Sequence, residues 1–479
     1  MKNIINMKKY IFLFVSLIFL NISCSDELNQ TPSSSLPGEE SIVDLNSLDI
    51  AVNGVYATLV DRWGFAGDAA LYADAKGGDI KIIDPVNHLQ PVVIFQTDKN
   101  SGFSIGAYQV FSYTIARVNS VLENLENVSD KDSDIDAFND YEGQLYALRA
   151  LAHFEMARLY SQIPVIAADV DAENSGIVIN DKLYPFNTKF ERSTLKDTYD
   201  FIVDDFKKSL DLLQKEKTEA SGKINYWAVE ALLSRAYLYM GDFDNALKYA
   251  VDVIENSPYK LYDIDSYLSV WSKTGTSESL FEVLTTDKSN AQRNSLGYYT
   301  NPDGYPEAGA GDDFQTWLLA QDKDVRSKSI RLKSTAKNEH KAYYTIKYEG
   351  QEGASAPLYV NNFKVIRLSE VYLIAAEAKL QGGNATAGKD AVWYYNELRK
   401  NRAKDHVDAS AVTLQDVLDE RRMELFCENH RMFDLVRNKM DVKATISTEP
   451  LKYNDYRILT AIPEREINIS PDLAQNPDW

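Results

Sequence analysis

The stretch from Thr413 to Arg437, TLQDVLDERRMELFCENHRMFDLVR, constrains this chain more than any other. Thr413 followed by Asp416 predicts a capped helix start, and the residues after it recur at helical spacing. Three carboxylates at four-residue intervals would share one side of a helix and repel one another unless cations lie between them: Glu420, Glu424 and Glu428. The cations available in the same stretch are Arg421, Arg422, Arg431 and Arg437. Because buried charges are costly unless fully paired, we expect a charge network that orders the fold rather than a catalytic centre.

The pattern ER-x-x-EL-x-x-E-x-x-R-x-x-DL-x-R in this stretch resembles the signature of the SusD/RagB-like nutrient-binding lipoproteins of Bacteroidetes. The matching residues are Glu420, Arg421, Glu424, Leu425, Glu428, Arg431, Asp434, Leu435 and Arg437. Asn429 stands where that family usually has glycine, and asparagine also tolerates a left-handed turn. The segments AVNGVY, RLSEVYLIAAEA and AIPEREINISPDLAQNPDW are similar to other parts of the family, so the resemblance covers nearly the whole mature chain.

Hydrophobic periodicity predicts helices over about 106–125, 144–160 and 195–213, and a possible strand over 91–95. Residues 225–258 fit the spacing of a degenerate tetratricopeptide repeat, with Gly241 ending its first helix. A second helix pair is expected over 366–403, divided by Gly382 and Gly383. Because these pairs are dispersed, they do not form an open solenoid. The resemblance therefore implies a mainly α, SusD-like fold, in which residues 41–479 form one domain of tetratricopeptide-like helix pairs with long loops and a few short strands.

The N-terminus reads as a secretory leader: Lys2, Lys8 and Lys9 precede a short apolar run. We expect residues 1–23 to be a signal peptide, Cys24 to carry the lipid, and residues 24–40 to form a tether. The sequence LNISC departs from a strict lipobox, which has leucine where this chain has Asn21. Ordinary cleavage and secretion, with loss of Cys24, is the alternative. An acidic Ser25-Asp26-Glu27 follows and resembles the surface-export signal of Bacteroidetes lipoproteins.

The net charge of −20 disfavours binding to nucleic acids and to anionic membrane surfaces. Cys24 and Cys427 are the two cysteines; one lies in the leader region, so a structural disulfide is not expected. We interpret Cys427 as a small packed residue.

Several motifs could indicate catalysis or metal binding, but the surrounding sequence lacks what such sites require. The GxSxG match around Ser104 lacks the preceding buried strand that a nucleophile elbow requires, so Ser104 is better read as part of a helix entry. The acidic runs 130–136 and 171–182 lack the ligand set of a calcium loop. The five histidines never reach metal-ligand spacing, and nucleotide-binding motifs are absent, so we expect no metal and no cofactor. Paired glycosidase carboxylates have no fixed spacing, so that alternative stays open.

A ligand is expected on two long irregular segments, 61–101 and 285–353, because recognition on a helical scaffold belongs to its loops. Both segments are rich in aromatic residues and glycine. The candidate binding residues are Trp63, Tyr72, Asp74, Lys76, Asn100, Tyr298, Tyr299, Tyr305, Trp317 and Tyr344. The alternative is that most of these rings pack the loops onto the scaffold. Trp317 and Tyr343 are balanced between the two interpretations, whereas Trp271 is assigned to the core.

The resemblance implies a surface-exposed, lipid-anchored outer-membrane protein without catalysis of its own. It would capture an oligosaccharide and deliver it to a SusC-like TonB-dependent transporter. An oligopeptide ligand, as in RagB-like members, is the alternative, and a surface glycan-degrading enzyme is a remote one. A plain tetratricopeptide adaptor is disfavoured by the leader, the dispersed repeats and the signature at 420–437.

Overall fold

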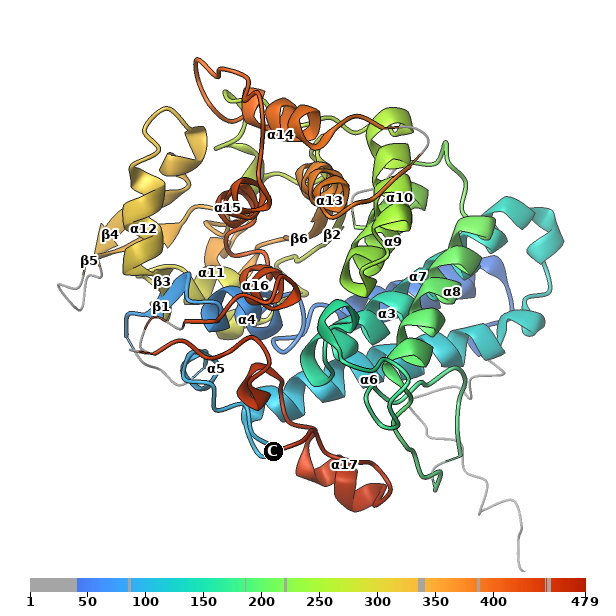
Figure 1. Cartoon of the computed structure of the whole chain (residues 1–479). Coiled ribbons are helices and arrows are strands. Elements are labelled where there is room, and N and C mark those ends of the chain that lie inside the picture. Colours follow the sequence, from blue (N-terminus) through green and yellow to red (C-terminus); the bar gives the residue numbers. More distant parts are fainter. Residues whose placement is uncertain are drawn as a thin grey trace, which may run out of the picture.

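The computed structural model describes residues 41–479, apart from 85–87, 186, 219–221, 335–340, 386–387, 444 and 446–448. The predicted signal peptide, Cys24 and the tether lie outside the described residues. Figure 1 shows that helices make up most of the molecule and that the strands are short. The prediction of a mainly α fold is therefore confirmed.

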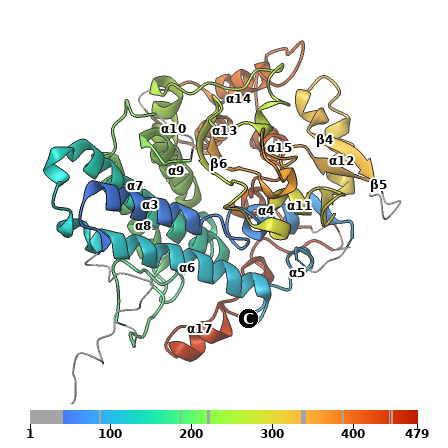
Figure 2. The same cartoon turned by 180° about the vertical axis from the view of Figure 1, so that it is seen from behind.

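Four long helices pack side by side on one flank of the molecule (Figure 2). They are α3 (Leu45–Thr58), α6 (Gly102–Glu123), α7 (Ile135–Tyr160) and α8 (Leu195–Leu212). α6 begins four residues before the predicted start because the Ser101 side chain accepts a hydrogen bond from the Ser104 backbone N–H. α7 also begins earlier than predicted, since Asp134 caps it and its first turns are acidic rather than apolar. Periodicity alone does not detect such polar first turns.

Two helix pairs that are distant in the sequence lie next to each other (Figure 1). They are α9 (Tyr226–Met240) with α10 (Phe243–Asn256), and α13 (Leu368–Leu380) with α14 (Ala391–Lys400). Gly241 ends α9 in the left-handed region, at a φ of 77°, as the repeat spacing predicts. Gly382 and Gly383 fall between α13 and α14, so the second predicted pair is also confirmed.

The chain between these helices forms short elements. The short helices are α4 (Asp68–Lys76), α5 (Gln90–Val93), α11 (Leu296–Tyr299) and α12 (Asp312–Leu319). Three antiparallel strand pairs accompany them: β1 (Ile80–Ile82) with β3 (Ala308–Ala310), β2 (Ser279–Val283) with β6 (Phe363–Arg367), and β4 (Ile330–Ser334) with β5 (Lys341–Thr345). The β1–β3 pair joins the two predicted ligand loops to each other.

The possible strand at 91–95 was wrong, because Val92 and Val93 belong to the short helix α5. The β-branched run favours a strand. Pro91 instead occupies the first turn of a helix, where a missing N–H costs nothing.

The signature stretch folds as two helices, α15 (Leu414–Glu424) and α16 (Arg431–Arg437), rather than one. The predicted cap is confirmed, since Thr413 and Asp416 form a reciprocal capping box. Between the helices, Cys427 and Asn429 adopt left-handed conformations at φ 62° and 66°. Glu428 therefore lies outside the helix that was expected to carry it.

The C-terminal segment returns to the first flank and carries α17 (Glu464–Ile469). Thr460 donates its N–H to the Leu159 carbonyl at 2.9 Å, and the Asn476 side chain donates to the Tyr160 carbonyl at 3.0 Å. One hydrophobic core extends from Ile42 to Leu473, and a smaller cluster contains Trp271, as predicted for that residue. The assignment of 41–479 as one domain stays a prediction.

Candidate functional site

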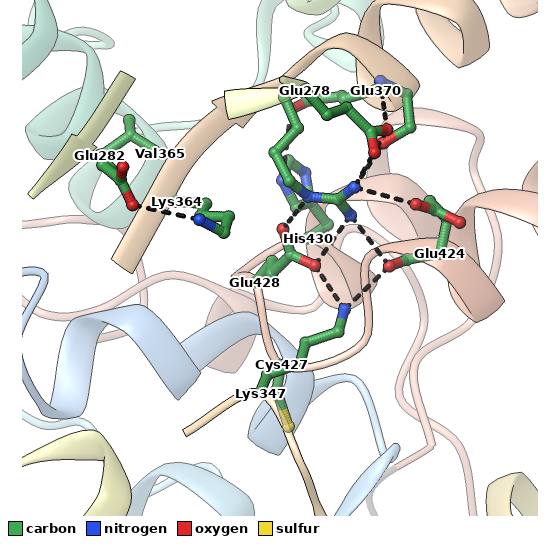
Figure 3. A network of polar contacts seen from close by, with 12 residues as sticks. Glu278, Glu282, Lys347, Lys364, Val365, Glu370, Glu424, Cys427, Glu428 and His430 are labelled. Atoms are coloured by element: carbon green, nitrogen blue, oxygen red, sulfur yellow. Dashed lines mark hydrogen bonds and ion pairs between the residues drawn. The ribbon is translucent and has the colours of Figure 1, made fainter. Parts of the chain in front are cut away.

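A network of buried charges joins the signature stretch to distant parts of the chain (Figure 3). The Glu424 carboxylate lies 3.0 Å from Arg326, 2.9 Å from Arg367 and 2.9 Å from Arg402. Glu428 pairs with Arg367 at 2.7 Å and also with Lys347. In Figure 3 the side chains of Glu428 and Lys347 point toward each other, and Lys347 also reaches the backbone carbonyl of Glu424 at 2.9 Å.

The remaining signature residues extend this network. Arg421 donates to Asp434 at 3.0 Å, and Arg437 pairs with Asp434 at 2.8 Å and with Glu377. Glu420 lies 2.6 Å from Arg326 and 2.7 Å from Arg399. Arg422 and Arg431 both face the Asp79 carboxylate. The prediction of a buried charge network in this stretch is thus confirmed.

The predicted cations were wrong, however. Glu420, Glu424 and Glu428 are neutralised by residues outside the signature: Arg326, Lys347, Arg367, Arg399 and Arg402. The arginines of the stretch point instead to Asp79, Glu377 and Asp434. Arg326 is 98 residues from Glu424 in sequence, a separation that local spacing does not reveal.

The electrostatics of the network indicate a structural role. Burial raises the pKa of Glu424, but Arg402, Arg367 and Arg326 outweigh this effect and hold its pKa well below the usual range. The pKa of Glu428 is also lowered, because Arg367 and Lys347 outweigh burial. Both groups are ionised at neutral pH and fully paired, so neither is suited to proton transfer. Arg326 and Lys347 belong to the segment 285–353, so the network anchors that loop to α15.

Five of the predicted ligand-binding residues are buried: Tyr72, Asp74, Lys76, Tyr299 and Tyr344. Lys76 donates to the Tyr72 hydroxyl at 2.8 Å, and burial lowers the pKa of its amine far below the ordinary value. Asp74 accepts hydrogen bonds from the N–H groups of Cys427 and Asn429, at 3.1 and 2.8 Å. In this structure these five side chains fill the scaffold and cannot touch a ligand, which corrects their assignment.

Two other predicted residues, Tyr298 and Tyr305, come together at the surface with two residues that the sequence did not single out, His88 and Tyr359. Ring centroids lie 4.8 Å apart for Tyr298 and Tyr305, 5.6 Å for Tyr298 and Tyr359, and 5.3 Å for His88 and Tyr305. All four side chains are half-buried. The exposed Arg293 lies beside them, and hydrogen bonds to the phenols of Tyr359 and Tyr305 raise the pKa of its guanidinium. We call His88, Arg293, Tyr298, Tyr305 and Tyr359 the aromatic face.

A tight turn and a buried carboxylate hold the aromatic face in place. The Tyr305 N–H donates to the Tyr298 carbonyl at 2.7 Å, and a Cβ on Gly304 would lie 2.3 Å from that oxygen, so only glycine fits the turn. Beneath it, Glu307 accepts hydrogen bonds from the backbone N–H groups of His88 and Leu89 at 3.0 and 3.1 Å. Burial raises the pKa of Glu307, but a hydrogen bond from the His88 side chain, together with these two backbone bonds, outweighs burial and lowers the pKa overall. The rings are therefore presented on a fixed support.

The other three predicted residues lie in different surroundings. Trp63 is half-buried against Phe103, with the Arg62 guanidinium 4.0 Å from its ring. Trp317 is half-buried on α12 beside Phe314 and Arg422, and Asn100 is exposed just before α6. None of their contacts within the described residues is with the aromatic face.

His88 and Tyr359 were missed for different reasons. His88 lies inside the predicted loop, but a lone histidine carries no spacing signal. Tyr359 lies six residues beyond the predicted end of the second loop, and the 3-10 helix Pro357–Tyr359 brings it back to Tyr298.

Other chemistry finds no support in the part of the chain that the structure describes. Ser104 is buried and donates to the Ala461 carbonyl, so it is not an exposed nucleophile. In the first acidic run, Asp134 caps α7 and Asp130 accepts from the Leu45 N–H. Over the described ranges, no group of His, Cys, Asp and Glu side chains could hold a metal ion. Within the same ranges, no helix has the length and apolar character needed to cross a membrane.

Comparisons with known proteins agree with this architecture. Residues 252–479 match the SusD family model, and residues 87–238 match the model described as "Starch-binding associating with outer membrane". A "SusD-like protein" of Bacteroides ovatus is 24% identical, and the alignment covers 90% of this chain and 82% of that one.

Solved structures show the same relationship. A SusD superfamily protein of Bacteroides thetaiotaomicron VPI-5482 matches with a TM-score of 0.83 and 29% identity, over 91% of this chain and 100% of that chain. A "Laminarin binding SusD-like protein" shares the fold, with a TM-score of 0.72 and 21% identity over 91% of this chain and 100% of that chain. This chain belongs to the SusD/RagB-like family.

Proposed function

We propose that this protein is a lipid-anchored protein of the outer cell surface that captures an oligosaccharide on its aromatic face. It passes the ligand to a SusC-like TonB-dependent transporter and carries out no catalysis itself. The observation that carries this proposal is the half-exposed cluster of Tyr298, Tyr305 and Tyr359 beside Arg293.

The chemistry of the aromatic face suits a sugar. The negative face of an aromatic ring attracts the slightly positive C–H groups on one side of a pyranose, and the ring loses little conformational entropy on binding. Arg293 adds several N–H donors for hydroxyl oxygens, and the exposed Asp303 nearby in sequence adds acceptors. The family description of starch binding and the laminarin-binding neighbour support the same ligand class.

The proposed lipid anchor is based on the N-terminal sequence, and the proposed transporter partner is based on the family. Lipid on Cys24 would hold the protein at the outer membrane, and the tether would let it move over the transporter. Replacing Cys24→Ser should release the protein from the membrane fraction, whereas retention in that fraction would contradict the anchor. The native protein should co-purify with a TonB-dependent transporter from detergent-solubilised outer membranes.

Calorimetric titration of the soluble form that begins at residue 25 tests ligand binding. Laminari- and malto-oligosaccharides form one panel, and oligopeptides of matched length form the other. We expect saturable binding to a sugar series and about ten-fold weaker binding for Tyr305→Ala, the effect of losing one stacking ring. Tyr456→Ala serves as the matched control, because Tyr456 is 38% exposed and lies outside the aromatic face.

Binding to peptides alone would replace the oligosaccharide with the RagB-like alternative. Equal affinity of the Tyr305→Ala variant and the wild type would remove the aromatic face from the proposal. Shortened sugars after incubation would contradict the absence of catalysis.

A further inference from the structure

A hollow lies on the flank formed by α3 and α6, which run side by side in Figure 2. Its volume is ≈ 610 Å³, and Trp63 is one of the residues that line it. We call it the α3–α6 groove. The residues used in the argument below are Gly54, Asp61, Trp63, Gln109, Tyr113 and Arg117.

Two glycines among the lining residues have different surroundings. A Cβ added to Gly54 would meet no atom within 4 Å, so the space above this helical position is open. Gly106 differs, because a Cβ there would lie 2.3 Å from the indole of Trp63. Gly106 thus lets the Trp63 indole pack against α6, whereas the space beside Gly54 on α3 stays open.

The wall on α6 presents Gln109, Tyr113 and Arg117 at successive helical turns. Tyr113 is 49% exposed, and its hydroxyl accepts a hydrogen bond from Arg117 Nε at 2.8 Å. This bond fixes the ring beside the groove. Gln109 is exposed and offers both a donor and an acceptor.

Trp63 and Asp61 add further hydrogen-bonding groups. The Trp63 indole N–H makes no hydrogen bond within the described residues, and the Asp61 carboxylate accepts the Trp63 backbone N–H at 2.8 Å while remaining exposed. The groove therefore combines two aromatic rings with a planar amide, one carboxylate and one guanidinium. Opposite charges in equal number favour a neutral, hydroxyl-rich ligand over a charged one.

A short chain of contacts links this groove to the aromatic face. Arg62 lies 4.0 Å over the Trp63 ring and 3.5 Å from the Asp68 carboxylate. Burial and the charge of Asp68 together raise the pKa of Tyr299, and the Tyr299 ring lies 5.1 Å from His88. The two surfaces thus share one buried support.

We propose that the α3–α6 groove is a second saccharide subsite, which binds the part of a long neutral oligosaccharide that extends beyond the aromatic face. This inference rests on the proposed function. It makes affinity depend on chain length: short oligosaccharides use the aromatic face alone, and longer ones gain the contacts of Trp63, Gln109 and Tyr113.

The test fills the groove without disturbing the fold. In Gly54→Leu the new side chain occupies the open space, and both leucine and alanine favour a helix over glycine. Gly54→Ala is the matched control, since it makes the same helix change but leaves most of the groove open. Each variant is titrated with laminari- and malto-oligosaccharides from the disaccharide to the octasaccharide, and Tyr113→Ala is measured in parallel.

We expect wild type and Gly54→Ala to bind the longest sugars about ten-fold more tightly than the shortest, the gain of one ring contact and one hydrogen bond. Gly54→Leu should lose that gain, Tyr113→Ala should lose part of it, and both should keep the affinity for short sugars. Equal length dependence in all four proteins would overturn the subsite but leave the proposed function intact. If wild type binds neither series at any length, the proposed function fails, and the subsite fails with it.

Discussion

Glu424 is the residue on which most of the buried charge network converges. Arg326, Arg367 and Arg402 all pair with its carboxylate inside the protein. Removing the carboxylate leaves positive charges buried without their partner, which costs far more than the pair itself contributes.

We therefore predict that Glu424→Gln lowers the free energy of unfolding by about 3–5 kcal/mol, measured by urea denaturation. The matched control is Glu397→Gln, because Glu397 pairs with Lys400 in an exposed ion pair at 2.8 Å. That change should cost less than about 1 kcal/mol. A similar small effect for both variants would contradict a structural role for the network.

Asp74 predicts a pH dependence of stability. Burial, followed by the charge of Asp79, raises its pKa to about 8, whereas the pKa in the unfolded chain is about 3.9. Between these values the folded state holds a proton that the unfolded state has lost, so the contribution of Asp74 to stability falls as pH rises.

We expect the urea midpoint of the wild type to fall more steeply between about pH 5 and about pH 8 than that of Asp74→Asn, which stays neutral throughout. The variant should start from a lower midpoint, because its amide NH2 would face one of the two backbone N–H groups and cannot accept a hydrogen bond from it. Parallel pH profiles would show that Asp74 is not the titrating group.

Some residue-level features could be predicted from the sequence. Asparagine tolerates a left-handed conformation, and Asn429 adopts one. Cys427 was interpreted as a small packed residue, and it is buried. The partners of Glu424 could not be predicted, since they come from three remote segments that only the folded chain brings together.

At the scale of the elements, two glycines in helical contexts have opposite roles. Gly54 lies inside α3 with open space around it, and Gly241 ends α9 at a φ of 77° with Val165 close by. At Gly54, an added methyl group reduces the conformational entropy of the unfolded chain. At Gly241, it forces a residue with a side chain to adopt the left-handed conformation.

Gly54→Ala should therefore stabilise the protein by about 0.5–1 kcal/mol, and Gly241→Ala should destabilise it by about 1–2 kcal/mol. Thermal or urea unfolding of the two variants and of the wild type measures the direction of both stability changes. If both substitutions moved stability in the same direction, the assigned helix positions would be contradicted.

The long helices were predictable because an apolar stripe records one buried face. The prediction errors occur where this apolar pattern is weak. The early turns of α7 are polar, the run 91–95 is too short to distinguish a strand from a helical turn, and Asp74 breaks the signature helix from a site more than 350 residues away. A cap decides the start of α7, Pro91 starts α5, and the contacts of Asp74 accompany the break in the signature helix, so none of the three is recorded in the apolar pattern.

At the scale of the whole molecule, the charge network and the aromatic face belong to one arrangement. Arg326 and Lys347 tie the segment 285–353 to the signature stretch, and the same segment carries Tyr298 and Tyr305. The signature therefore helps to hold in place the segment that carries these two rings.

The candidate site was predictable only in part. Tyr298 and Tyr305 were proposed because they lie in the long segment 285–353, which is rich in aromatic residues and glycine, whereas His88 and Tyr359 join them from other segments. Tyr72, Tyr299 and Tyr344 show the limit of composition, since a tyrosine in a loop serves equally well as core packing.

The most direct test of the account is a crystal structure of the protein with the oligosaccharide that binds best in the calorimetric panel. The account predicts a sugar ring against Tyr305 or Tyr359, with hydroxyl groups within hydrogen-bonding distance of Arg293. A saccharide bound elsewhere, with the rings of Tyr298, Tyr305 and Tyr359 left in solvent, would contradict it.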